Sequence, residues 1–145
     1  MTGGTDGVGK EIALGLARAG VRVLLVGRDA DKGARAVTSL VAASGAPHVE
    51  FLAADLSLMR QVDRLANEVM RRVPSLRYLV HSAGIVRGRH TRTAEGVETN
   101  FAVNYLGRFA LTKRLLPLLQ ATAAWGVRPD RDHRWRRAER DGSFR

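Results

Sequence analysis

Hydrophobic residues near the start of the chain follow two different patterns. Over 7–19 they recur every three or four positions, which predicts an amphipathic helix that Gly20 ends. The residues of this repeat are Val8, Ile12 and Leu16, with Ala13 and Ala17 beside them. The next segment, VRVLLVG over 21–27, is almost continuously apolar, and such a short run is typical of a strand buried on both faces.

The alternation of helix and strand continues along the chain. Residues 29–44 begin with acidic side chains and predict a second helix. The segment VEFLAADL over 49–56 predicts a second strand, and Ser57 is placed to cap a helix over 58–72. A third buried strand is predicted for LRYLVHSAG over 76–84.

A long helical stretch over about 95–124 completes the pattern, and Pro117 within it should cause a kink or a break. Strands that alternate with helices of this length predict parallel βαβ units. The crossovers of such units are right-handed, which leaves few topologies to consider. We therefore expect an α/β fold with a doubly wound parallel sheet over residues 1–124.

Residues 125–145 differ from everything before them. They hold both tryptophans and seven arginines, contain almost no aliphatic residues, and show no periodicity. We interpret 1–124 as a partial domain and 125–145 as an irregular arginine-rich tail of out-of-frame sequence. The net charge of the chain, +10, is compatible with nucleic-acid binding, but no basic helix face or nucleic-acid motif accompanies it, so we expect no nucleic-acid partner.

Composition narrows the function classes further. The chain has no cysteine, which excludes disulfides and thiolate metal sites, and its four histidines lack metal-ligand spacing. We expect no metal site. Neither a signal peptide nor an apolar run of membrane-spanning length is visible, so a cytoplasmic protein without a membrane partner is the expectation.

The first ten residues, MTGGTDGVGK, predict a phosphate-binding turn. Glycines at positions 3, 7 and 9 let a ligand approach the backbone closely, and a helix follows at once. A helix N-terminus offers free N–H groups and a positive dipole end to a diphosphate. The spacing, Gly-x-x-x-Gly-x-Gly, differs from the Gly-x-Gly-x-x-Gly of the common dinucleotide fingerprint.

Further motifs follow this turn in order and at matching intervals. They are GRD at 27–29, ADL at 54–56, SAG at 82–84 and NFAVNYLG at 100–107. With the glycine turn they resemble the short-chain dehydrogenase/reductase family over about residues 2–120, its retinol-dehydrogenase-like branch in particular. The resemblance implies a Rossmann-like fold and an oxidoreductase. The opening TGGTDGVGKE and the alanine-, glycine- and arginine-rich composition are similar to ketoreductases of antibiotic biosynthesis.

The resemblance also implies a cofactor site. Its residues would be Thr2, Gly3, Thr5, Gly7, Val8, Gly9, Arg28, Asp55, Leu56, Ala83 and Gly84. Gly27 occupies the position at which NAD-preferring relatives carry an acid, and Arg28 follows it, which favours NADP(H) because a guanidinium suits a 2′-phosphate. Asp55 would bind the adenine amino group, or it would cap the next helix.

The resemblance identifies Asn104 as a catalytic asparagine, although a helix asparagine bound only to backbone would look the same in sequence. The family's reaction needs a tyrosine with a lysine four residues later, and an upstream serine. Four residues after Tyr78 and Tyr105 stand Ser82 and Phe109, so that pair is absent from this chain.

These gaps lead to an expectation about the ends of the chain. We expect an incomplete fold that lacks the family's first strand and its C-terminal half, as in a truncated reading of a longer protein. The leading function is NADPH-dependent reduction of a small-molecule carbonyl compound. The alternatives are a catalytically inactive nucleotide-binding remnant and a basic, nucleic-acid-binding product. The sequence does not indicate an oligomeric state.

Overall fold

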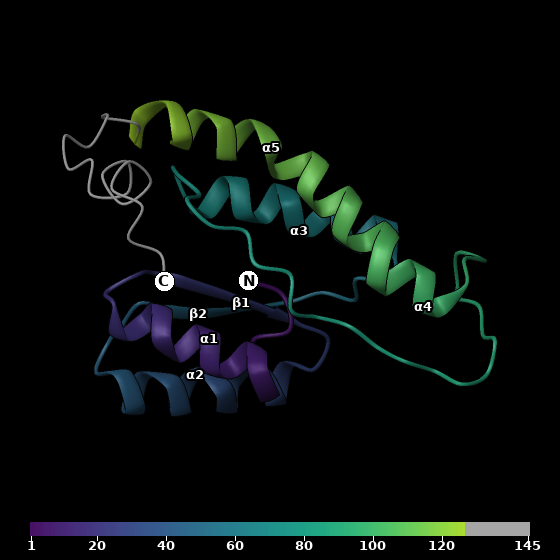
Figure 1. Ribbon diagram of the computed structural model, residues 1–145, viewed down its shortest axis with the longest axis horizontal. Helices are drawn as coiled ribbons and strands as arrows, with labels where there is room; N and C mark the ends of the chain where they lie inside the picture. Colours follow the sequence, from purple (N-terminus) through teal and green to yellow (C-terminus); the bar gives the residue numbers. More distant parts are fainter. Residues whose placement is uncertain (127–145) are drawn as a thin grey trace, which may run out of the picture.

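The computed structural model describes residues 1–126, which form two strands and a series of helices (Figure 1). The elements are α1 (Gly7–Arg18), β1 (Val23–Gly27), α2 (Ala30–Ser44), β2 (Val49–Ala53), α3 (Met59–Arg72), α4 (Thr99–Phe101), the π-helix η1 (Ala102–Leu106) and α5 (Gly107–Gly126). The arginine-rich tail expected over 125–145 falls almost entirely outside the described residues, since α5 ends at Gly126.

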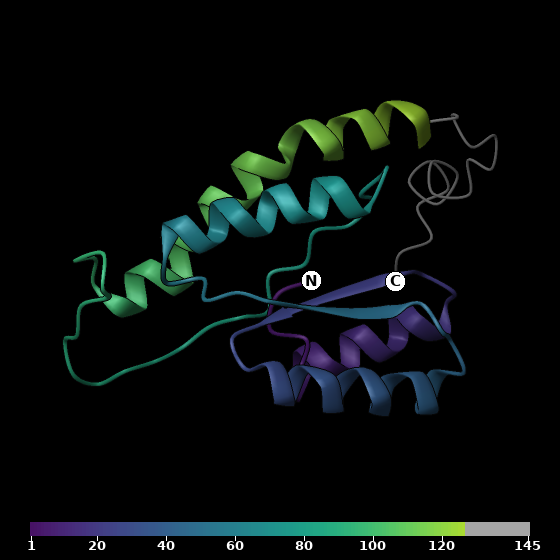
Figure 2. The same cartoon turned by 180° about the vertical axis from the view of Figure 1, so that it is seen from behind.

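Strands β1 and β2 run parallel, in a register that pairs Val23 with Val49 and Gly27 with Ala53. Helices α1 and α2 cover one face of this sheet, and α3 and α5 cover the other (Figures 1 and 2). This is the doubly wound arrangement of a Rossmann-like α/β fold, as the alternation of periods predicts.

The continuous apolar run of β1 is explained by burial on both faces. Leu25 belongs to a cluster with the buried residues of α1 and α2, while its neighbour Val26 belongs to a cluster with those of α3 and α5. Successive strand residues point to opposite faces, so each core receives alternate side chains of β1. Leu40 and Leu115, each 1% exposed, are among the largest fully buried side chains of the two cores. Burial of a side chain of this size contributes about 2 kcal/mol.

The inward face of α1 differs from the one that we predicted. Val8 is 74% exposed and Ile12 is 38% exposed, whereas Gly9, Ala13 and Ala17 are buried. A Cβ atom at Gly9 would lie 2.1 Å from the carbonyl oxygen of Gly3, so the helix packs too closely for a large residue on that side. The small residues therefore form the centre of the core face. Leu16 packs at its edge, and Val8 and Ile12 lie outside it.

Residues 76–84 do not form the predicted buried strand. Their only sheet-like pairing among the described residues is an isolated parallel bridge between Thr2 and His81. The Thr2 N–H donates to the Val80 carbonyl (2.9 Å), and the Ser82 N–H donates to the Thr2 carbonyl (3.1 Å). Earlier in the segment, a cleft of about 620 Å³ lies between residues 73–80 and the start of β1. A strand needs a hydrogen-bonding partner along its whole length, and here the pairing is limited to one residue, Thr2.

The start of α3 is capped by a residue other than the predicted Ser57. The N-cap position is Leu58, whose side chain makes no capping bond. Instead the carboxylate of Glu95 accepts from the N–H groups of Met59 (2.6 Å) and Arg60 (3.3 Å). A carboxylate suits the positive end of a helix, and this one comes from a distant loop.

Helix α5 continues through Pro117, so the helix is not broken at this residue. Pro117 is exposed, which lets the carbonyl group that it leaves unpaired one turn earlier reach water. In residues 1–126, no helix combines the length and apolarity that crossing a membrane requires.

Candidate functional site

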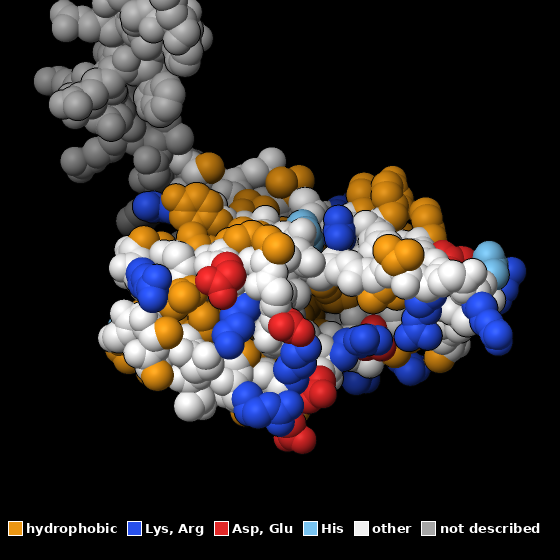
Figure 3. Space-filling view, turned by 60° about the horizontal axis from the view of Figure 1, so that its bottom comes forward, with side chains coloured by type: hydrophobic (Ala, Val, Ile, Leu, Met, Phe, Trp, Pro, Cys, Tyr) orange, Lys and Arg blue, Asp and Glu red, His pale blue; other side chains and the backbone are white. Residues whose placement is uncertain are grey.

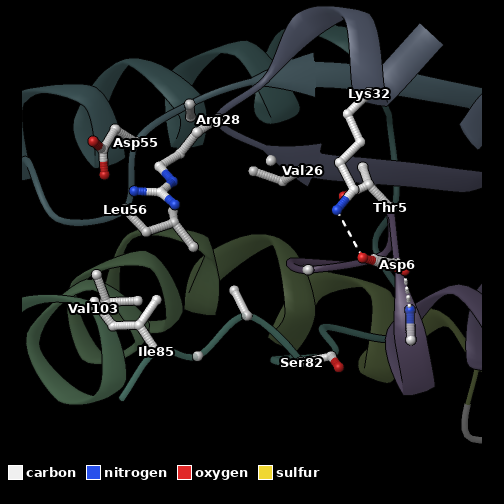
Figure 4. Close-up of a pocket in the computed structure, with 16 residues that line it drawn as sticks. Thr5, Asp6, Val26, Arg28, Lys32, Asp55, Leu56, Ser82, Ile85 and Val103 are labelled. Atoms are coloured by element: carbon white, nitrogen blue, oxygen red, sulfur yellow. Dashed lines mark hydrogen bonds and ion pairs between the residues drawn. The ribbon is translucent and has the colours of Figure 1, made fainter. Parts of the chain in front are cut away.

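A groove of about 390 Å³ lies at the carboxyl ends of β1 and β2. Open α/β sheets bind their ligands at this edge. Its walls come from the glycine turn, the ends of both strands, the first turn of α2, residues 82–85 and η1 (Figure 4). The lining residues are Gly3, Thr5, Asp6, Gly7, Val26, Gly27, Arg28, Lys32, Ala54, Asp55, Leu56, Ser82, Ala83, Gly84, Ile85 and Val103.

The glycine turn has a backbone shape that only glycine fits. Gly3 has φ +68°, and a Cβ atom there would lie 2.4 Å from the Ala83 nitrogen. Gly7, with φ +49°, opens helix α1. The Asp6 carboxylate accepts from the Gly7 N–H (2.8 Å), so this acid caps the helix. At Gly3 and Gly7 the turn therefore presents bare backbone to the groove, beside the N-terminus of α1 that Asp6 caps.

Eight of the eleven residues that the resemblance identified line this groove. They are Gly3, Thr5, Gly7, Arg28, Asp55, Leu56, Ala83 and Gly84. The other three have different positions. Thr2 is fully buried and accepts from the Ala83 N–H (3.3 Å) through its hydroxyl, Gly9 packs against Gly3, and Val8 faces solvent on α1. Thr2 and Gly9 thus support the turn from behind, and Val8 lies outside the groove.

Arg28 and Asp55 follow the two strands directly. Arg28 comes after the last residue of β1, is exposed, and extends its guanidinium into the groove (Figure 4). The Asp55 carboxylate accepts from the Ser57 N–H (2.9 Å), and the Asp55 N–H donates to the Gln61 side chain (2.8 Å). One carboxylate oxygen of Asp55 therefore stabilises the turn before α3. It does not cap the helix, because the first N–H groups of α3 donate to Glu95.

The sequence analysis missed an ion pair at the edge of the groove. Lys32 Nζ lies 2.7 Å from Asp6 Oδ2, and both residues are among those that line the groove (Figure 4). The hydrogen bond from Lys32, followed by the Gly7 N–H, lowers the pKa of the Asp6 carboxyl. The two residues are 26 positions apart, and a lysine in the first turn of a helix gives no sequence signal of such a contact.

Asn104 binds backbone. Its amide accepts from the Ile85 N–H (3.0 Å) and donates to the Ile85 carbonyl (2.7 Å). One turn earlier, Asn100 makes the same two bonds to Arg87, at 2.8 and 3.0 Å. Asn104 lies within η1, a local widening of the helix of the kind found at functional sites. The two asparagines fix residues 85–87, and through Ile85 they fix one wall of the groove.

Behind this wall His81 is held in one tautomer. The Thr112 hydroxyl donates to the Arg108 carbonyl (2.8 Å), so it accepts from His81 Nε2 (2.9 Å). His81 Nδ1 is then an unprotonated acceptor, and within the described residues it is buried without a partner. Burial, and then the charge of Arg108, lower the pKa of His81.

This lowered pKa predicts a stability change with pH. Between the folded-state pKa and the ordinary value of 6.5, the unfolded chain binds more protons, so the free energy of unfolding should fall as the pH decreases below about 6.5. Urea unfolding at pH 7.5 and pH 5.5 measures the change. His81→Gln keeps a donor near Thr112 and should reduce the slope, while the exposed His48→Gln should retain it. Equal slopes in both variants would contradict the prediction.

The groove fits a dinucleotide. It offers a turn of glycines that a Cβ would obstruct, a helix N-terminus and a cation at the end of the first described strand, which together define a nucleotide-binding α/β domain. The chain belongs to the short chain dehydrogenase family, whose model matches residues 1–127.

Curated relatives are identical to this chain at a little more than a third of the aligned positions. It is 36% identical to polyprenol dehydrogenase of Mus musculus over 126 residues, which cover 87% of this chain and 38% of that protein. It is also 36% identical to retinol dehydrogenase 11 of Mus musculus, with 85% of this chain and 39% of that protein covered. The chain thus spans less than two-fifths of the length of these relatives.

Solved structures of the family superpose on the described residues. The NADP complex of RhlG from Pseudomonas aeruginosa has a TM-score of 0.71 and 35% identity, covering 83% of this chain and 47% of that one. L-sorbose reductase from Gluconobacter frateurii, in complex with NADPH and L-sorbose, has a TM-score of 0.69 and 26% identity, covering 83% and 46%. These similarities confirm the Rossmann-like fold.

Proposed function

We propose that this chain forms the NADP(H)-binding part of an NADPH-dependent carbonyl reductase. The observation that carries the proposal is the position of Arg28 in a groove that also contains the glycine turn. Gly27 leaves no acid at the end of β1 to bind a ribose 2′-hydroxyl, and the guanidinium of Arg28 offers a planar fork for a 2′-phosphate. The NADP and NADPH in two similar solved structures support this choice of cofactor.

The proposal gives several residues of the groove a role. Gly3, Gly7 and the N-terminus of α1 would hold the diphosphate, and Arg28 would hold the 2′-phosphate. Asp55 would bind the adenine amino group with its remaining acceptor capacity, with Leu56, Ala83 and Gly84 around the adenosine. When bound, the nicotinamide supplies the hydride for reduction of a carbonyl group.

The proposal also covers the role of Asn104 and the class of substrate. Asn104 would act from η1 by fixing the wall at Ile85, as a positioning residue. The finer proposal is a small-molecule ketoreductase of antibiotic biosynthesis, similar to the daunorubicin C-13 ketoreductase. It is supported by the opening TGGTDGVGKE and by the composition of the chain.

One observation favours a second candidate, a nucleotide-binding protein without reductase activity. Tyr78 and Tyr105 are 55% and 59% exposed, and neither has a lysine four residues later. A phenol without a neighbouring ammonium has little tendency to exchange a proton near neutral pH.

Two measurements on the chain of residues 1–145 separate these candidates. Fluorescence titration should show saturable NADPH binding that is tighter than NADH binding. Oxidation of NADPH by a panel of aldehydes and ketones tests the reductase. Binding without oxidation would favour the inactive protein, and the absence of NADPH binding would overturn both.

A further inference from the structure

The proposed cofactor site contains an ion pair to which it gives no role. Lys32 comes from the first turn of α2, and Asp6 comes from the glycine turn in front of α1. Their 2.7 Å contact therefore joins two walls of the groove, while Arg28 extends into the same groove at a separate point (Figure 4).

The pair is held weakly, and its two members differ in mobility. Their side chains are 44% and 76% exposed, so water competes with the contact and its net contribution is small. Asp6 is also fixed by the backbone, because its other carboxylate oxygen accepts from the Gly7 N–H. Lys32 has a flexible four-carbon stem and no second side-chain bond within the described residues. An anion in the groove would therefore move the lysine and leave the acid in place.

The charges around the groove favour such an exchange. The charged residues that line it are the cations Arg28 and Lys32 and the acids Asp6 and Asp55. Lys and Arg side chains outnumber acidic ones on the molecular face in Figure 3. A phosphate monoester carries nearly two negative charges at neutral pH, so it attracts an ammonium group more strongly than one carboxylate does.

We propose that Lys32 exchanges Asp6 for the 2′-phosphate of NADP(H), so that Asp6 competes with the cofactor for this lysine. The inference rests on the proposed function. NADH has no 2′-phosphate and leaves the Asp6–Lys32 pair intact. Lys32 therefore raises the preference for NADPH, and Asp6 lowers it.

Four variants of the full chain test this exchange by titration with NADPH and NADH. Asp6→Asn keeps an acceptor for the Gly7 N–H and should tighten NADPH binding about threefold. Lys32→Met should weaken NADPH binding about tenfold. Lys32→Met should alter NADH binding less than about twofold. Asp6→Asn should tighten NADH binding less than NADPH binding, because it removes a charge beside the diphosphate of both dinucleotides but frees Lys32 for the 2′-phosphate alone. In the double variant, Asp6→Asn should tighten NADPH binding less than it does alone, because the lysine that it frees is gone. Asp31→Asn is the matched control, since Asp31 lies in the same turn of α2 but does not line the groove.

A second pair of probes isolates the phosphate. Adenosine 2′,5′-bisphosphate should bind more tightly than adenosine 5′-monophosphate, and Lys32→Met should reduce that difference. Equal effects of the variants on NADPH and NADH, or strictly additive effects in the double variant, would overturn the exchange while the cofactor site stands. Failure of the unsubstituted chain to bind either dinucleotide would overturn the proposed function and the exchange with it.

Discussion

Arg28→Ala should weaken NADPH binding about thirtyfold and change NADH binding less than about twofold. The reason is that the 2′-phosphate of NADPH would lose its charge-assisted contact with the guanidinium, whereas NADH has no such phosphate. Arg28 is exposed and directed into the groove at the end of β1, so its removal leaves the fold intact. A charge-assisted hydrogen bond contributes about 2 kcal/mol, which corresponds to the stated factor in the dissociation constant.

Fluorescence titration with both dinucleotides measures this effect, and Arg18→Ala is its control. Arg18 lies at the far end of α1, is exposed, and donates only to the Ala43 carbonyl (3.4 Å) among the described residues. Its replacement should leave both affinities unchanged. An equal loss of NADPH and NADH affinity in Arg28→Ala would show that the arginine supports the groove rather than the phosphate.

Gly9→Ala should lower the free energy of unfolding by about 3 kcal/mol and abolish dinucleotide binding. A Cβ atom at this position would lie 2.1 Å from the Gly3 carbonyl oxygen and 2.9 Å from the Ser82 hydroxyl. The first contact is with backbone, which cannot rotate away. Helix α1 would have to move off the glycine turn, and the turn would lose the shape that exposes its N–H groups to the groove.

Gly15→Ala, in the same helix, is the matched control. A Cβ atom at Gly15 meets nothing within 4 Å, and alanine is the better helix former by about 0.8 kcal/mol. This variant should be slightly more stable than the unsubstituted chain and should bind NADPH equally well. Urea unfolding followed by circular dichroism compares the two. A Gly9→Ala variant as stable as Gly15→Ala would contradict the close packing of α1.

Local periodicity was sufficient to predict the fold around β1. Its uninterrupted apolar run is long enough for a strand, and its burial on both faces follows from Leu25 and Val26 in separate cores. The same kind of run over 76–84 gave a wrong prediction. Hydropathy reports how apolar a segment is, whereas a strand also needs a partner for its backbone, and Thr2 is the partner that forms the bridge.

Side-chain pairings between distant residues explain the other differences. The Glu95 cap of α3 and the Lys32–Asp6 ion pair each join positions more than 20 residues apart. Neither Glu95 nor Lys32 belongs to a local sequence motif. The inward face of α1 was mispredicted for a related reason, since hydropathy favours Val8, whereas the approach of the Gly3 carbonyl admits only the smallest residue at position 9.

The glycine turn and the residue after β1 were found from sequence because their chemistry is local. Backbone with positive φ at Gly3 and Gly7 needs glycine wherever the turn occurs, and the strand end is read directly from the apolar run. The binding roles assigned to these residues remain predictions that the titrations test.

The attachment of residues 85–87 to the helical segment has a mechanical consequence. Ile85 and Arg87 are bound through both backbone groups by Asn104 and Asn100, and no strand within residues 1–126 pairs with them. A rotation of η1 would therefore carry Ile85 with it and would widen or narrow the groove. We expect the size of the groove opening to follow the orientation of this helix.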